Sequence, residues 1–173
     1  TSAEMVAGPV FFQKEDNFLF DFQQIEMASL QAVTLGSFGL KIPFMCNGAN
    51  LAYSKKFFKV LNGFKGNEQL ASGDDVFLLQ KAIAKSPEKV HYLKSRNTIV
   101  TTKPLNDWKS LFYQHVRWAS KTSSYQSTFG IRLGLLVFVG NLSWLLALGS
   151  WLLGLTTFQN VFVLVALKFL VDT

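Results

Sequence analysis

Two adjacent carboxylates are the first groups in this sequence that could do chemistry. Asp74 and Asp75 follow Gly73 and precede an apolar run, so they lie in the first turn of a predicted helix. A carboxylate in an enzyme cleft can act as a general base and accept the proton of a hydroxyl group. Alternatively, the acids only interact favourably with the helix dipole, which is worth about 0.3–1 kcal/mol. Two adjacent acids are a weak signal for a metal site.

A second set of candidate groups lies in the sequence Gln114-His115-Val116-Arg117-Trp118. On a helix, Arg117 and Trp118 are three and four residues after Gln114, so the amide, guanidinium and indole groups share one face. A guanidinium can pair with two phosphate oxygens, and an indole offers a flat apolar face to a ring such as that of a sugar. The alternative is that Arg117 and Trp118 anchor the helix among lipid headgroups.

A third candidate is the loop sequence Cys46-Asn47-Gly48. Gly48 permits a tight backbone next to a ligand. Cys46 could be a nucleophile, but the only two histidines, His91 and His115, are far away in the sequence. A buried, unreactive thiol is therefore the better interpretation of Cys46.

Turn and capping signals indicate the elements that must position these groups. Gly8-Pro9 interrupts an apolar run, Ser54 can cap a helix, and Asn62-Gly63 can end it. The pattern predicts strands near 6–12, 44–53, 90–93 and 98–102, and helices at 18–34, at 54–61 and from 74 onward. This alternation indicates an α/β layered domain with fewer elements than a complete one.

The chain ends in an apolar tail. No charged residue occurs between Leu133 and Leu155, and a helix of that length covers about 34 Å, enough for a hydrocarbon core of about 30 Å. We expect a first span at 133–155 and part of a second at 158–173, which contains Lys168. A buried core helix is the alternative to the first span.

Cations and aromatic side chains alternate just before this tail. Residues 107–125 have apolar side chains at spacings of three and four, which predicts an amphipathic helix that lies on a membrane surface or packs on the body. The formal charge of +6 belongs entirely to residues 1–132, so the positive-inside rule predicts a cytoplasmic body. A basic chain could bind nucleic acid, but the cations are dispersed and we expect no nucleic-acid partner.

In chain order, Cys46-Asn47-Gly48-Ala49-Asn50, Gly73-Asp74-Asp75, Gln114-x-x-Arg117-Trp118 and the apolar tail resemble the membrane-bound family 2 glycosyltransferases. These include bacterial cellulose synthase, poly-N-acetylglucosamine synthase, hyaluronan and chitin synthases, and ceramide glucosyltransferase. The resemblance covers about residues 6–155. It implies the C-terminal half of a GT-A-like catalytic domain at 1–105, an interfacial helix with the Gln-x-x-Arg-Trp motif at 106–130, and a transmembrane region at 131–173.

The resemblance also implies roles for the matched residues. Asp75, with Asp74 as its acidic partner, matches the final acid of the family's Thr-Glu-Asp motif. In the family that acid is the general base of an inverting sugar transfer from a nucleotide-sugar. The resemblance implies a uridine diphosphate sugar as the donor. Gln114, Arg117 and Trp118 match the motif that holds the diphosphate and the acceptor sugar. Cys46, Asn47 and Gly48 match the loop near the acceptor.

One part of the family pattern is missing. No Asp-x-Asp motif occurs in this sequence, although the family uses one to hold Mg²⁺ or Mn²⁺ on the donor diphosphate. We therefore expect the metal ligands to lie outside this sequence, and the 173-residue chain to be inactive alone.

The expected partners are a nucleotide-sugar donor, a saccharide or lipid-linked acceptor, and membrane lipid. The expected role is cell-envelope or exopolysaccharide synthesis at the bacterial inner membrane, with the catalytic body on the cytoplasmic side. A non-processive lipid glycosyltransferase and a non-enzymatic membrane adaptor remain as alternatives.

Overall fold

The computed structural model describes residues 3–66, 73–122 and 127–172. The chain divides into two compact units, Thr1–Ser127 and Thr128–Thr173, which are described separately. The first combines helices with small sheets, so the mixed helix and strand character expected from the sequence is confirmed.

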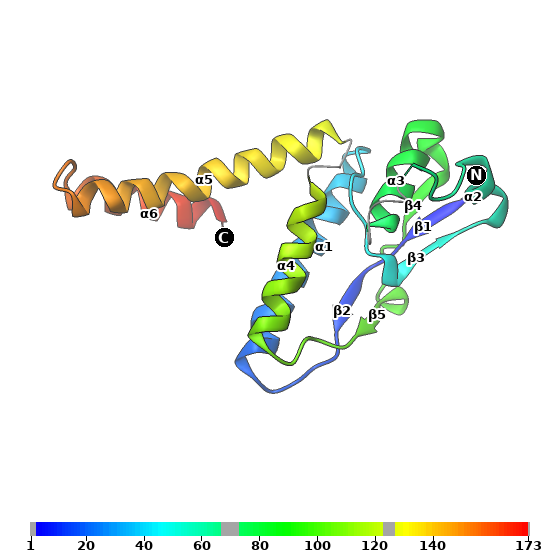
Figure 1. The fold of residues 1–173 in the computed structure, drawn as a ribbon, viewed down its shortest axis with the longest axis horizontal. Helices are drawn as coiled ribbons and strands as arrows, with labels where there is room; N and C mark the ends of the chain where they lie inside the picture. The colour runs from blue at the N-terminus through cyan, green and yellow to red at the C-terminus, as the bar shows by residue number, and fades with distance from the viewer. Residues whose placement is uncertain (1–2, 67–72, 123–126, 173) are drawn as a thin grey trace. The chain divides into compact units, whose positions relative to one another are not determined.

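The first unit contains two small sheets (Figure 1). Strand β1 (Met5–Ala7) lies between β3 (Leu51–Tyr53), which is antiparallel to it, and β4 (Val90–Tyr92), which is parallel. Strand β2 (Val10–Phe12) pairs in parallel with β5 (Val100–Thr102). The Gly8-Pro9 step separates β1 from β2, as predicted, because proline has no N–H to donate to a sheet.

Four α-helices accompany these sheets: α1 (Phe18–Gly39), α2 (Lys55–Val60), α3 (Asp74–Lys85) and α4 (Trp108–Thr122). Short 3₁₀ turns occupy Gly48–Asn50, Pro87–Lys89 and Arg96–Thr98. The predicted caps are present at α2, where the Ser54 side chain accepts the Phe57 N–H and Asn62 adopts a positive φ after the helix. Helix α1 continues past the predicted end at Thr34.

The strand predicted at 44–53 is wrong over most of its length. Only Leu51–Tyr53 is a strand, and a 3₁₀ turn precedes it. The Asn47 side chain accepts the Ala49 N–H at 3.0 Å, so this residue caps a turn instead of continuing an extended strand. The resulting loop lies beside the start of α3, which brings two of the candidate sets together.

The core lies between the larger sheet and helices α2 and α3. Met5, Ala7 and Val90 from the strands pack with apolar residues of both helices, and all of them are buried. The members from the helices are Phe57, Leu78, Leu79 and Ala82, together with Leu61, which caps the end of α2. Cys46, from the loop before β3, also belongs to this cluster. The core therefore fixes both the loop and α3.

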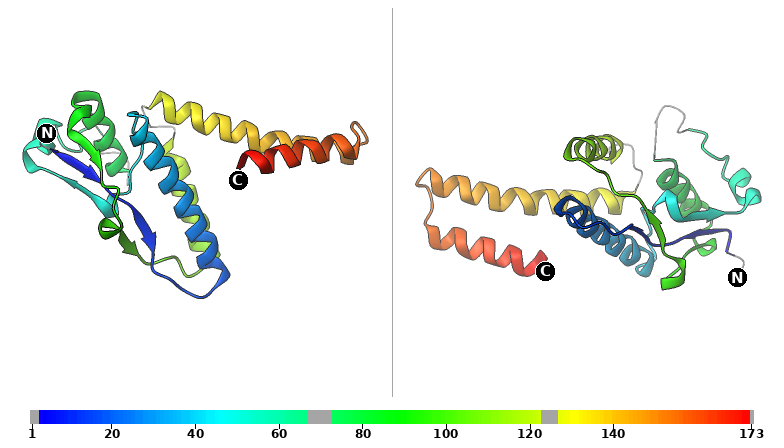
Figure 2. Two further views of the ribbon diagram at one scale, coloured as in Figure 1. Left: turned by 180° about the vertical axis from the view of Figure 1, so that it is seen from behind. Right: turned by 90° about the horizontal axis from the view of Figure 1, so that it is seen from below.

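Helix α4 runs beside α1 in the same direction (Figure 1, Figure 2). The Gln23 amide of α1 is buried and bonds to both backbone groups of Leu105, accepting its N–H at 2.8 Å and donating to its carbonyl at 3.0 Å. Farther along, Glu26 lies 2.5 Å from Nε2 of His115 on α4. These contacts position α4 on the body.

The second unit is a pair of apolar helices, α5 (Thr128–Leu152) and α6 (Phe158–Asp172). Helix α5 is long and apolar enough to cross a membrane, and none of its residues is buried. It begins before the predicted start at Leu133. It ends at Leu152 because Gly154, two residues later, adopts a φ of 71°, a conformation that terminates helices. Helix α6 is shorter and also apolar.

Candidate functional site

Asp75 lies at the start of α3 with both carboxylate oxygens engaged. Gly73 precedes the helix with a φ of 97°, a backbone conformation that glycine adopts without strain. Oδ1 of Asp75 accepts the N–H of Val76 at 2.8 Å. Oδ2 accepts the N–H of Gly48 at 2.8 Å. Two backbone donors therefore hold the carboxylate in one orientation, and its remaining lone pairs can accept a further proton donor.

The contact between Asp75 and the loop depends on Gly48 having no side chain. A Cβ added to Gly48 would lie 3.1 Å from Oδ2 of Asp75 and 3.3 Å from its Cβ. Both distances are tighter than ordinary van der Waals contact, so any other residue would displace the loop or the acid. Gly48 is exposed and Asp75 is partly exposed, so a bound molecule can reach this pair.

Two other residues of the loop fix its position on the body. Asn50 donates from Nδ2 to the carbonyls of Pro9 and Thr98, at 2.9 and 2.7 Å, and so joins the loop to segments that flank both sheets. Cys46 is buried in the core. Burial and the nearby charge of Asp75 raise the pKa of the Cys46 thiol far above its usual range. The thiol is therefore neutral near pH 7, as expected for a structural residue rather than a nucleophile.

Asp74 lies in the same helical turn as Asp75 and is exposed. Within the described part of the chain, His, Cys, Asp and Glu residues form no group of three or more that could hold a metal ion. Asp74 and Asp75 are two adjacent acids and do not form such a group.

Gln114, Arg117 and Trp118 all lie on α4. Arg117 is exposed, whereas Gln114 and Trp118 are partly buried. The His115 ring packs edge-on against Trp118, with 5.6 Å between centroids, and Glu26 contacts the same histidine. Within the described part of the chain, no hydrogen bond, ion pair or ring contact joins the motif to Asp75. The structure therefore bonds the loop to the acid but does not bond the motif to the acid.

Two residues of this region were not singled out from the sequence. Glu26 lies within a predicted helix, and nothing in its local sequence indicates a partner on α4. Asn50 belongs to the loop motif, but its contact with Thr98 spans two segments that are distant in the sequence. The only signal for these Asn50 contacts was the residue type itself, because asparagine side chains in turns commonly form hydrogen bonds with backbone groups.

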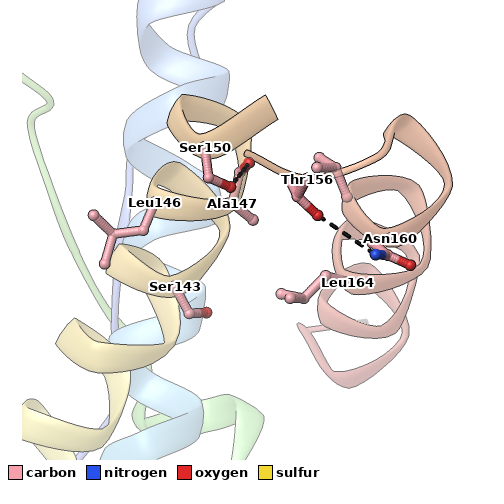
Figure 3. A pocket seen from close by; sticks show the side chains of 8 residues that line it. Ser143, Leu146, Ala147, Ser150, Thr156, Asn160 and Leu164 are labelled. Atoms are coloured by element: carbon pink, nitrogen blue, oxygen red, sulfur yellow. Dashed lines mark hydrogen bonds between the residues drawn. The ribbon is translucent and has the colours of Figure 1, made fainter. Parts of the chain in front are cut away.

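The second unit contains a cavity of about 400 Å³ between α5 and α6 (Figure 3). Its polar lining residues are Ser143, Ser150, Thr156 and Asn160. Ser143 and Ser150 donate to carbonyls of their own helix, at Gly140 and Ala147. Such internal bonds satisfy hydroxyl groups within an apolar helix, so these side chains need no ligand.

Comparison of the chain with protein-family models, curated proteins and solved structures finds no match in any of the three.

Proposed function

We propose that this chain forms the acceptor side of an inverting, membrane-bound glycosyltransferase that uses a nucleotide-sugar donor. The observation that carries the proposal is the 2.8 Å hydrogen bond from the Gly48 N–H to Oδ2 of Asp75. The family resemblance assigns the loop to the acceptor and the acid to proton removal. Those two roles require adjacent positions, and the two motifs, which are distant in sequence, are in direct contact.

In the proposed reaction, Asp75 is the general base. Its carboxylate takes the proton of an acceptor hydroxyl while the hydroxyl oxygen forms a bond to the anomeric carbon of the donor sugar. The bond from that carbon to the diphosphate breaks, and the nucleoside diphosphate leaves with the electron pair. Attack opposite the leaving group inverts the anomeric configuration. The N–H groups of Gly48 and Val76 orient the base for this transfer.

Helix α4 is proposed to bind the donor diphosphate and the acceptor sugar. The exposed Arg117 guanidinium offers the donors that pair with diphosphate oxygens, and Trp118 offers an aromatic face to the acceptor sugar, with Gln114 beside them. Binding of substrate would have to bring this helix face toward Asp75. Mg²⁺ or Mn²⁺ would neutralise the diphosphate in the complete enzyme. Its ligands are expected elsewhere in the protein, because the sequence lacks the Asp-x-Asp motif with which the family holds this metal.

The apolar helix α5 supports a membrane location for this enzyme. The body that precedes it carries the whole formal charge of +6, which favours the cytoplasmic side of the bacterial inner membrane. That side is where nucleotide-sugars are made, and a growing cell-envelope or exopolysaccharide chain would start there.

A transfer screen tests this function. Membranes that contain the full-length protein would be supplied with a panel of labelled nucleotide-sugars and with Mg²⁺ or Mn²⁺. We expect one sugar to enter a saccharide or lipid product, and the 173-residue chain alone to transfer none. Long products indicate a polysaccharide synthase, and single additions to lipid indicate a non-processive lipid glycosyltransferase. Absence of transfer and of donor hydrolysis across the panel would favour a non-enzymatic adaptor.

A further inference from the structure

Helix α4 carries a row of side chains that begins where the helix contacts α1. Trp108, Leu111, His115 and Trp118 follow one another at spacings of three and four residues, so they share one face of the helix. Trp108 packs against Phe22 of α1, with ring centroids 5.5 Å apart, and Leu111 is buried. The row therefore starts in the packing against α1 and ends at Trp118, the aromatic residue of the Gln-x-x-Arg-Trp motif.

A carboxylate on α1 bonds to the histidine in this row. Glu26 lies four residues after Phe22, and its Oε1 is 2.5 Å from Nε2 of His115. An ionised carboxylate only accepts hydrogen bonds, so Nε2 of His115 is the donor. The Glu26 side chain is 31% exposed and that of His115 is 36% exposed, so both are sheltered from much of the solvent. A carboxylate bonded to one ring nitrogen fixes the tautomer and the orientation of an imidazole. Glu26 therefore sets the orientation of the His115 ring.

The oriented His115 ring in turn contacts the Trp118 indole. The ring centroids are 5.6 Å apart and the ring planes are inclined at 76°, which is the edge-to-face geometry that aromatic pairs favour. An indole that is partly exposed can adopt several side-chain rotamers, and a ring packed against it favours one of them. A continuous set of contacts therefore runs from Glu26 on α1, through His115, to the aromatic ring of Trp118.

Other contacts hold α4 on the body when Glu26 is removed. The Gln23 amide bonds to both backbone groups of Leu105, just before the helix. The Trp108 ring keeps its contact with α1, and Leu111 stays buried. Loss of the Glu26 carboxylate should therefore displace the His115 and Trp118 rings more than it displaces the helix itself.

We propose that Glu26 is a positioning residue of the acceptor site: acting through His115, it orients the Trp118 indole against the acceptor sugar. This rests on the proposed function, which assigns Trp118 to that sugar. Among the described residues, neither Asp75 nor Arg117 takes part in these contacts. Loss of Glu26 should therefore impair transfer to a saccharide more than it impairs hydrolysis of the donor, in which water replaces the acceptor.

The ratio of transfer to hydrolysis tests this role in the full-length enzyme. Membranes would be supplied with labelled UDP-glucose, UDP-N-acetylglucosamine, UDP-glucuronate and GDP-mannose, and both the sugar bound in product and the sugar released would be counted. We expect Glu26→Ala and His115→Ala to lower the ratio about 2- to 10-fold, the size of one aromatic contact. Glu26→Gln keeps an oxygen that accepts the Nε2 hydrogen and should restore most of the ratio. Asp21→Ala, at an exposed acid of the same helix, is the matched control and should leave the ratio unchanged.

Fluorine NMR reports the orientation of Trp118 without any sugar. The 173-residue chain contains four tryptophans, so 5-fluorotryptophan labelling in lipid nanodiscs gives a small set of signals that single Trp→Phe variants assign. We expect Glu26→Ala and His115→Ala to shift or broaden the Trp118 signal and to leave the Trp108 signal in place. Glu26→Gln should keep the Trp118 signal close to that of the wild type.

The two measurements separate this role from the proposed function. If Glu26→Ala lowered transfer and hydrolysis equally, or moved the Trp108 and Trp118 signals together, Glu26 would only hold the helix and the positioning role would be wrong. An unmoved Trp118 signal, or an unchanged ratio in an enzyme that does transfer sugar, would also overturn this role and leave the proposed function standing. If the wild type transferred none of the four sugars, the proposed function would fail first, and the acceptor role of Glu26 with it.

Discussion

At the scale of single residues, the proposed reaction depends on the arrangement of Asp75. A general base must keep an unobstructed oxygen lone pair and a fixed direction. The N–H groups of Val76 and Gly48 fix the direction by binding one oxygen each, and a carboxylate retains further acceptor sites. In the proposed reaction, Gly48 would therefore act through Asp75, as a positioning residue.

Replacing Gly48 by alanine should disturb this arrangement. The added Cβ would lie 3.1 Å from Oδ2 of Asp75, so the carboxylate or the loop must shift by a few tenths of an ångström. We expect sugar transfer by the full-length enzyme to fall about 10- to 100-fold, since small misplacements of catalytic groups have effects of this size. Gly36→Ala is the matched control, because nothing lies within 4 Å of its added Cβ. Unchanged transfer by Gly48→Ala would show that the contact does not matter.

The thiol of Cys46 should be unreactive in the folded chain. Burial and the charge of Asp75 raise its pKa, so the thiolate that reacts with iodoacetamide is scarce at pH 8. The pKa of the Cys46 thiol is higher in the folded chain than its ordinary value of about 8.5. The protonated thiol therefore contributes fully to the free energy of unfolding below about pH 8.5, and this contribution is lost as the pH rises above that value. Mass spectrometry should detect alkylation only after denaturation. Rapid alkylation of the native chain would contradict this.

At the scale of elements, α1 connects the sheets to the helix that carries the motif. Its Gln23 side chain replaces a missing strand or helix partner for both backbone groups of Leu105. Without that amide, the partly buried N–H and carbonyl of Leu105, just before α4, would lose their partners, at up to about 1–3 kcal/mol per unpaired group. The Gln23 side chain is therefore one of the contacts that position α4, together with the Glu26–His115 pair.

The Gln23→Ala variant should therefore loosen α4 without unfolding the core. We expect amide hydrogen exchange in α4 to accelerate about 30-fold, which corresponds to about 2 kcal/mol, while the strands keep their protection. Gln13→Ala, at an exposed position, should change exchange little. If both variants exchange alike, Gln23 does not hold the helix.

Local signals were sufficient to predict most elements but not their contacts. Ser54 and the acids after Gly73 mark helix starts that the structure contains, because capping depends only on neighbouring residues. The strand expected at 44–53 was wrong because hydrophobicity does not reveal that the Asn47 side chain caps a turn. Likewise, nothing local joins Glu26 to His115, and only the family resemblance linked the Gly48 loop with Asp75.

At the scale of the whole molecule, the chain combines a mixed helix and strand unit with an apolar helical pair. Helix α5 is long and apolar enough to cross a membrane, and none of its residues is buried within its own unit. The proposed membrane location rests on that length and apolar composition.

Charges at the centre of α5 should impair its insertion. The double variant Val139→Arg/Leu142→Arg should lower the inserted fraction strongly, because each central arginine costs about 2.5–3.5 kcal/mol. In Thr128→Arg/Leu152→Arg, the charges lie at the helix ends, where arginine can extend to the interface. A glycosylation-mapping assay in microsomes measures both fractions. Equal insertion of the two variants would count against a span centred on these residues.

The most direct test of the central claim is the turnover of the full-length enzyme with Asp75→Asn. An amide of the same shape keeps only one acceptor oxygen for the Gly48 and Val76 N–H groups and cannot take up the hydroxyl proton, so we expect a fall in kcat of at least about 100-fold with little change in KM for the donor. Asp16→Asn, at an exposed loop position, controls for loss of a negative charge and should keep its activity. If Asp75→Asn turned over as fast as Asp16→Asn, Asp75 would not be the base and the account would be wrong.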